Sequence, residues 1–165
     1  MDRDDALPDF QPLFDAGRYA DVIEACDTAL AVGSAEFRLH YHKAHAKWLL
    51  GEEQAAIDEM SRALNLRPDE PALRYFRGLW LLERADYRSA IPDLVQARLL
   101  DERLNSEYYS NSAAFLLIIA HLYCGEFEHA ARERESLPRP IKTFALGRLW
   151  TTADVDSLIA RRARP

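Results

Sequence analysis

Three histidines close together in the sequence are the first residues whose types could do chemistry. They are His40, His42 and His45, and imidazole is a common zinc ligand. On a helix, His42 and His45 would share a face, while His40 would point away from His42. Two histidines without a placed carboxylate or a third ligand are a weak zinc signal. We therefore expect no metal site and interpret the three as helix-surface residues.

Nucleophilic catalysis has no motif in this chain. Ser110, Ser112 and His121 are present, but nothing sets them in a nucleophile–base arrangement. There is no GxSxG, P-loop, GxGxxG or HExxH pattern. The acidic pair Glu52 and Glu53 falls at an expected turn, where both carboxylates would be solvated. The chain is therefore expected not to be an enzyme and to need no cofactor.

Composition and charge indicate a soluble globular protein. Of 165 residues, 48% are hydrophobic and 29% are charged, with a formal net charge of −6. This balance is unlike that of disordered chains, and no basic block would attract nucleic acid or anionic lipid. Cys26 and Cys124 lie far apart without CxxC spacing, and no apolar signal core is seen, which favours a reduced, cytoplasmic setting. The most apolar run, Ala113 to Ile119, is too short to span a bilayer and predicts a buried helix.

An internal repeat predicts the architecture. Three similar segments start 34 residues apart, at Gly17, Gly51 and Ala85. Two columns are identical in all three, an isoleucine and a later alanine: Ile23, Ile57 and Ile91, and Ala29, Ala63 and Ala97. A weaker fourth copy begins at Gly125 after a step of 40 residues, so six extra residues are expected within 101–107, as a longer loop or an extended helix. Such a period is typical of stacked helix hairpins.

Helices are predicted on both sides of each turn. The spacing of Ile23 and Cys26 gives one apolar face of a helix. Ser34 is expected to cap a helix over 35–50, and Asp69 to cap one that runs to about residue 83 with Pro71 in its first turn. A long helix is predicted from about residue 105 to 123. Pro92 lies in the first turns of its helix and could shift or kink that start.

The C-terminal part differs from the repeats. Pro138 and Pro140 are expected to stop the last repeat helix, and a short helix is predicted around 141–146. Thr151 and Asp154 fit a capping box for a final helix to Arg162, which would cover the last repeat. No sustained alternation or hairpin-turn pair predicts a strand. The expected fold is all-α, an α–α superhelix in one domain over 1–165, with repeats at about 8–33, 34–67, 68–101 and 105–137 and a C-terminal cap over 140–163.

The repeated columns resemble the tetratricopeptide repeat. The Gly-x-Tyr turn at Gly17 and Tyr19 carries the resemblance, as do its variants at 85–87 and 125–127, the Ala-Ile pairs at 56–57 and 90–91, and the late alanines. Three copies are in register, and the resemblance covers roughly residues 8–137. The family's favoured tryptophan in the first helix is missing, and His40, Arg74 and Ala114 stand there. The number of regular repeats is therefore expected to be three or four.

The resemblance implies a binding scaffold whose first helices line a concave groove. Carrying over the groove-facing register gives nine expected partner-binding residues: Tyr41, His45, Trp48, Tyr75, Leu79, Leu82, Phe115, Ile119 and Leu122. The set lacks the Lys and Asn of the family's carboxylate-clamping version, so an apolar partner segment is expected. Packing between repeats is the alternative role for each aromatic side chain, including Tyr108 and Tyr109.

Four functional hypotheses follow from these observations. The first is a protein–protein adaptor, without nucleic acid or membrane insertion. Size, acidity and three repeats are also similar to the secretion chaperones of bacterial type III systems, so a dedicated chaperone for an exported or aggregation-prone client is the alternative. A homodimer paired through an exposed groove is a third hypothesis. An enzyme that depends on His42 or His45 is the fourth.

Overall fold

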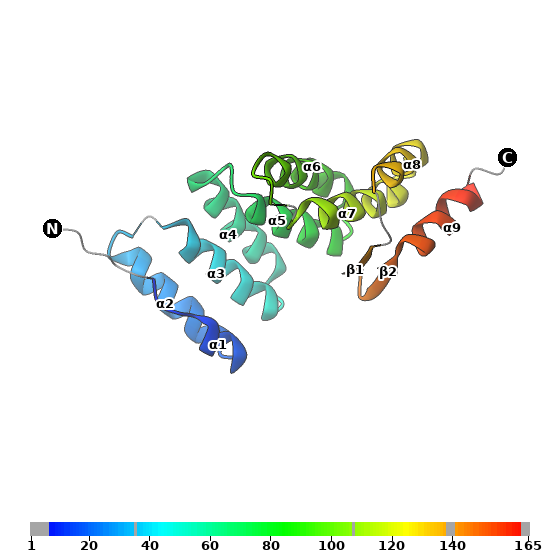
Figure 1. Cartoon of the computed structure of the whole chain (residues 1–165). Helices are drawn as coiled ribbons and strands as arrows, with labels where there is room; N and C mark the ends of the chain where they lie inside the picture. The colour runs from blue at the N-terminus through cyan, green and yellow to red at the C-terminus, as the bar shows by residue number, and fades with distance from the viewer. Residues whose placement is uncertain (1–6, 35, 107, 138–140, 163–165) are drawn as a thin grey trace. The chain divides into compact units, whose positions relative to one another are not determined.

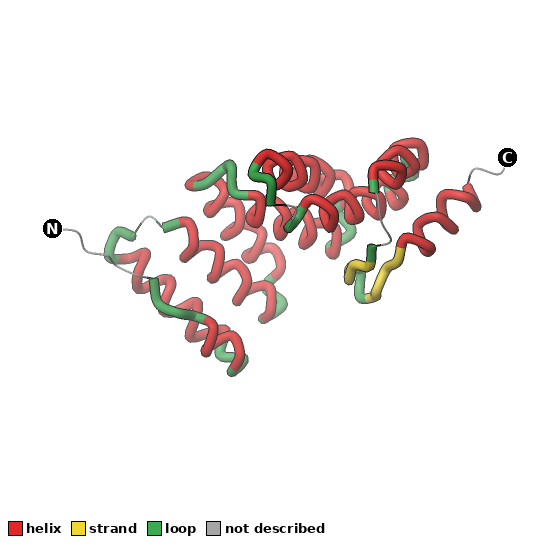
Figure 2. The backbone as a smooth tube through the Cα atoms, in the orientation of Figure 1, coloured by secondary structure: helices red, strands yellow, loops and turns green. Residues whose placement is uncertain are grey.

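The computed structural model describes residues 7–34, 36–106, 108–137 and 141–162. The chain divides into two compact units, Met1–Pro68 and Asp69–Pro165. Helices dominate both (Figures 1 and 2), and the only strands among the described residues are two short ones near the C-terminus. The fold class is all-α, built from successive helix hairpins, as the repeat predicts. Within the described residues, no helix combines the length and apolar character that crossing a membrane requires.

The first unit contains two helix pairs. Its helices are α1 (Gln11–Asp15), α2 (Tyr19–Ala31), α3 (Phe37–Leu49) and α4 (Glu53–Leu66). The core between the first three is formed by Phe10, Val22, Cys26, Leu39 and Ala46, all buried. Glycines at the turns adopt positive φ, including Gly17 at 68° and Gly51 at 79°. Residues with a Cβ atom rarely adopt this backbone conformation. This explains why glycine starts three of the four repeated segments, at 17, 51 and 125, while Ala85 adopts a φ of 61° without glycine's freedom.

The prediction that Ser34 caps the second hairpin is wrong. The N-cap position of α3 is Glu36, which makes no side-chain cap hydrogen bond. Gly33, with φ of 90°, ends α2, and the Ser34 amide donates to Ala29 O at 3.3 Å. Ser34 thus closes the preceding helix, because a glycine in the left-handed conformation directs the next amide back to the helix end. Residue 35, the expected first residue of the helix, lies outside the described residues.

The second unit contains two further helix pairs and a C-terminal segment. The pairs are α5 (Pro71–Glu83) with α6 (Tyr87–Arg103), and α7 (Ser110–Tyr123) with α8 (Phe127–Ser136). Pro71 opens α5 as predicted, but Glu70 rather than Asp69 holds the N-cap position. Helix α6 continues through Pro92 from an N-terminus capped by Asp86. Within the expected range 101–107, α6 extends to Arg103 and residues 104–106 lie outside the helix.

Helix α7 begins five residues later than predicted because its cap comes from another helix. Asp101 of α6 is fully buried, and its Oδ2 accepts hydrogen bonds from the amides of Tyr109 and Ser110, each at 2.8 Å. The first N–H groups of a helix have no acceptor within the helix, so without Asp101 these two amides at the start of α7 would lack a partner. Asn105, with φ of 51°, turns the chain out of α6, which ends at Arg103. No local residue pattern shows this arrangement.

Replacing Asp101 with alanine should lower the free energy of unfolding by about 1–2 kcal/mol, because two buried amides lose a charged acceptor. Urea denaturation followed by circular dichroism measures the change. Asp86→Ala is the matched control, since Asp86 is exposed and accepts one bond at 3.3 Å, from the Ser89 amide. Equal losses for the two variants would contradict the tertiary capping role.

The C-terminal segment corrects two predictions. Strands β1 (Lys142–Ala145) and β2 (Arg148–Thr151) form an antiparallel hairpin where a short helix was predicted and no strand was expected. Leu146 and Gly147 have φ of 52° and 69°, the conformation of a type I′ hairpin turn. Leucine is an unusual residue there, so the turn escapes the usual Asn-Gly or Asp-Gly search. Pro138 and Pro140, the predicted stops, lie outside the described residues.

Helix α9 (Thr152–Arg162) follows the hairpin directly and starts with the predicted capping box. The Thr151 amide donates to Asp154 Oδ2 at 2.7 Å, and the Asp154 amide donates to Thr151 Oγ1 at 3.3 Å. The hydrogen bonds hold the pKa of Asp154 below its usual value. The reciprocal pair satisfies amides that would otherwise be unpaired at the helix start.

Candidate functional site

An aromatic face on α3 is the main candidate surface of the first unit. Tyr41, His45 and Trp48 are each partly exposed, and the rings of Tyr41 and His45 lie 4.5 Å apart. Burial lowers the pKa of His45 to about 4, aided by the nearby His42. The imidazole is therefore neutral near pH 7, and the face presents uncharged aromatic surface, which suits an apolar ligand group.

His42 packs against aromatic side chains at the first helix. Its ring lies 4.9 Å from that of Phe10 and 6.2 Å from that of Phe14. Burial, with the charge of Arg38, lowers the pKa of His42. In the described part of the chain, no group of three or more His, Cys, Asp or Glu side chains could hold a metal ion. His40 points elsewhere and contacts Glu59 of α4.

The six predicted partner-binding residues of the second unit fall into two groups, partly exposed and buried. Tyr75 and Leu79 of α5 are partly exposed. Tyr75 packs against Phe76 and Tyr109 at 5.4 and 5.0 Å, and burial raises its pKa. The four other predicted residues lie in the core: Leu82, Phe115 and Ile119 are 0% exposed and Leu122 is 9% exposed. Their role in partner binding remains a prediction. Of the six predicted residues in this unit, Tyr75 and Leu79 are the two that are partly exposed.

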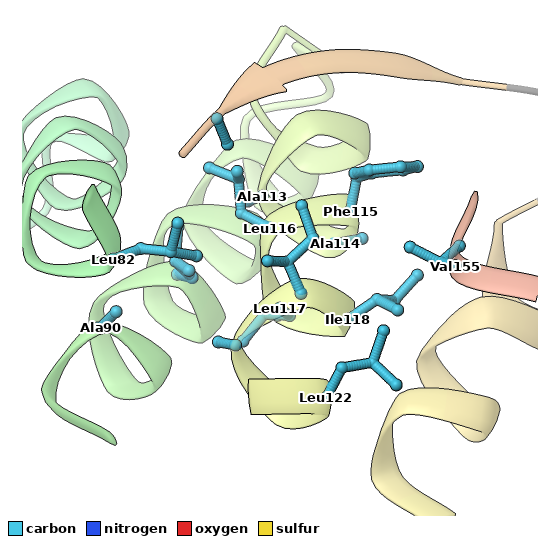
Figure 3. Close-up of a cluster of buried hydrophobic side chains, with 14 of the residues drawn as sticks. Leu82, Ala90, Ala113, Ala114, Phe115, Leu116, Leu117, Ile118, Leu122 and Val155 are labelled. Carbon is cyan, nitrogen blue, oxygen red and sulfur yellow. The ribbon is translucent and has the colours of Figure 1, made fainter. Parts of the chain in front are cut away.

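The chain's own C-terminal segment packs on α7. Ala145, Trp150 and Val155 join the same buried cluster as Phe115, and Figure 3 shows Val155 of α9 on the side of α7 where Phe115 and Ile118 project. The Leu146 amide donates to Glu83 Oε1 of α5 at 2.8 Å, which fixes the hairpin turn. Side chains of α7 that the repeat register assigns to a partner are thus covered within this unit.

A buried carboxylate joins the two helices of the second hairpin in the first unit. Glu59 of α4 is 3% exposed; its Oε2 lies 2.8 Å from His40 Nδ1, and its Oε1 accepts from Lys43 Nζ at 3.1 Å. Burial acts to raise the pKa of Glu59, but the hydrogen bonds from His40 and Lys43 outweigh it and keep the pKa below its usual value. We call this group the Glu59 cluster.

The second unit contains the same arrangement with arginines. Asp93 of α6 is 3% exposed and accepts hydrogen bonds from Arg74 at 3.0 Å and from Arg77 at 2.6 and 2.8 Å. We call this group the Asp93 cluster. Its three positions lie 34 residues after His40, Lys43 and Glu59. Sequence reasoning missed both clusters, although the recurrence of base, base and acid at the repeat period was a usable signal.

The clusters explain one departure from the repeat pattern. His40 and Arg74 occupy the column where the tetratricopeptide family favours tryptophan. In this chain a basic side chain in that column contacts a buried acid of the second helix instead. The polar pair fixes which helices meet, and it leaves the aromatic residues of α3 and α5 on another side of each helix.

Comparison with solved structures now identifies the fold. A tetratricopeptide TPR2B domain of yeast Sti1, in its pHsp70 complex, superposes with a TM-score of 0.60 over 74% of this chain and 90% of that one, at 16% identity. The chain has a tetratricopeptide-repeat fold. MamA from Desulfovibrio magneticus RS-1 gives a TM-score of 0.69 over 93% of this chain and 81% of its own, at 17% identity. The Yersinia enterocolitica type III secretion translocator chaperone SycD gives 0.63 over 69% and 79%, at 16% identity.

At such identities the likeness is one of fold. No protein-family model matches the chain, and no curated protein matches it in sequence. The tetratricopeptide-repeat fold hosts many different partners, so the site must carry the functional argument. The relevant features are the partly exposed aromatic faces and the surfaces of the C-terminal segment.

Proposed function

We propose that this tetratricopeptide-repeat chain is a protein-interaction scaffold that binds an apolar segment of a partner protein. The observation that carries the proposal is the aromatic face of α3, where Tyr41, His45 and Trp48 are partly exposed and His45 is held neutral by burial. Tyr75 and Leu79 of α5 would add a second contact surface. Aromatic side chains with part of their area exposed are typical anchors for partner segments.

The nine predicted residues have two different roles in this proposal, partner contact for the exposed ones and core packing for the buried ones. Leu82, Phe115, Ile119 and Leu122, which the repeat register also assigns to partner binding, support α5 and α7 from inside the second unit. We propose one functional domain over both units, in the cytoplasm, without catalytic activity. The pHsp70 complex of the Sti1 domain supports a role in protein binding for helix hairpins of this kind.

A triple variant tests the proposed surface. Tyr41→Ala, Trp48→Ala and Tyr75→Ala together should abolish co-purification of the partner, because the main apolar anchors are removed. The control combines Val32→Ser and Leu104→Ser, which replace exposed apolar side chains outside the surface, 83% and 61% exposed. Circular dichroism first establishes that each variant keeps its helical content. Unchanged partner retention by a folded triple variant would remove the proposal.

A dedicated chaperone is the second candidate. The similarity to SycD, a secretion chaperone by its description, favours it. In that case the partner would be a single exported or aggregation-prone protein with an apolar segment. Co-expression should then convert that protein from an insoluble to a soluble form, and the triple variant should lose this effect. A partner that is fully soluble alone would favour the adaptor instead.

A further inference from the structure

Charge is divided unevenly along the chain. Residues 138–165 contain six Lys or Arg and two Asp, a net +4. Because the whole chain carries −6, residues 1–137 carry −10. The C-terminal segment that covers α7 is therefore cationic on an otherwise acidic protein. Such an asymmetry attracts acidic partners to one part of the surface.

The β-hairpin of this segment has an inner and an outer face. Ala145 and Trp150 point inward and are 0% and 3% exposed, and the indole Nε1 donates to Ala145 O at 3.0 Å. Phe144 and Leu149 are direct cross-strand partners on the outer face, 66% and 56% exposed. A paired aromatic and aliphatic side chain in solvent is unusual on a two-stranded hairpin whose other face already supplies the packing.

A lysine flanks the apolar pair. Lys142 lies two residues before Phe144 in β1, on the same face, and forms no ion pair with any described residue. Arg148 pairs with Ala145 across the hairpin and therefore lies on the face opposite to Leu149. Its guanidinium carbon is 3.8 Å from the centroid of the Trp150 ring, and its guanidinium lies 3.9 Å from Asp154 Oδ1. We call Lys142, Phe144 and Leu149 the hairpin surface.

We infer that the hairpin surface binds an acidic segment of another protein that carries large apolar side chains. Phe144 and Leu149 would receive the apolar anchor, while Lys142 attracts its carboxylates. The surface is distinct from the faces of α3 and α5, so this inference does not depend on the proposed function. An anionic bilayer fits less well, because the −10 of residues 1–137 would be repelled by it.

Fluorescence anisotropy with a labelled synthetic peptide tests the inference. The probe alternates Glu with Leu and Phe, and two comparison peptides replace every Glu by Lys, or every Leu and Phe by Ser. The full-length chain should bind the probe at least about tenfold more tightly than either comparison peptide. Phe144→Ser with Leu149→Ser should weaken probe binding about tenfold or more, and Lys142→Glu should weaken it and flatten its dependence on salt.

Matched variants separate the surface from general effects. Leu104→Ser removes an equally exposed apolar side chain, and Arg103→Glu reverses a charge elsewhere in the same unit; both should bind the probe as the wild type does. The Tyr41, Trp48 and Tyr75 triple variant should also bind it normally, which separates this test from that of the proposed function.

Four outcomes would overturn the inference. They are equal binding of the Lys peptide, probe binding that the hairpin variants leave unchanged, and binding of phosphatidylserine vesicles in place of the probe. The fourth is self-association, seen by light scattering, that the Phe144 and Leu149 replacements abolish while the wild type fails to bind the probe. The replaced side chains are more than half exposed, so the core remains intact in these variants.

Discussion

Replacing Asp93 by alanine should lower the free energy of unfolding by about 3 kcal/mol. The carboxylate is buried and accepts three hydrogen bonds from Arg74 and Arg77, whose side chains are only 26% and 23% exposed. Without Asp93, two guanidinium groups are left largely desolvated and without their common counter-charge. Urea denaturation at neutral pH, followed by circular dichroism and tryptophan fluorescence, measures the loss.

Two further variants decide whether the buried charge is the cause. Glu102→Ala, on the same helix, breaks an exposed ion pair at 3.8 Å to Arg98 and should cost less than about 0.5 kcal/mol. Replacing the whole cluster by Asp93→Leu, Arg74→Met and Arg77→Met should recover most of the lost stability, because no buried charge then lacks a partner. A cost for Asp93→Ala as small as that for Glu102→Ala would contradict the argument.

The repeat made the helices and their pairing predictable. Residues such as Ile57 and Ala63 are buried in α4 because their column faces the partner helix in every copy, so similarity at a 34-residue spacing reports packing directly. Local capping was predicted correctly at Thr151 and Asp154, whereas Ser34 and Asp69 do not hold the N-cap positions expected of them. It was missed at α7, where the acceptor Asp101 belongs to another helix.

The C-terminal hairpin and its effect on the candidate site could not be predicted from local pattern. Its strands are four residues each, and its turn uses Leu146 in a conformation that leucine rarely adopts. The hairpin covers α7, so the repeat register alone assigns Phe115 and Ile119 to a surface that this chain fills itself. On α3 the register selected partly exposed residues, and on α5 it selected the partly exposed Tyr75 and Leu79 together with the buried Leu82.

Lowering the pH from 7.5 to 5 should destabilise the protein by about 2 kcal/mol through His45 alone. Burial, with His42 nearby, lowers the pKa of His45 in the folded state from 6.5 to about 4. The unfolded chain therefore takes up the proton first, and stability is lost as the pH falls below 6.5, down to about 4. His42, whose pKa is lowered by burial and by Arg38, acts in the same direction.

Comparison with His45→Gln isolates this contribution. The variant cannot titrate, so its free energy of unfolding should fall by about 2 kcal/mol less than that of the wild type over the same pH interval. Glu59 does not interfere, because its lowered pKa places its loss of stability below pH 4.5. Every other ionisable side chain is common to the two proteins, so the difference between their pH slopes reports His45. Equal pH slopes for the two proteins would show that the imidazole of His45 accepts a proton in the folded state, and the α3 face would then carry a charge in mild acid.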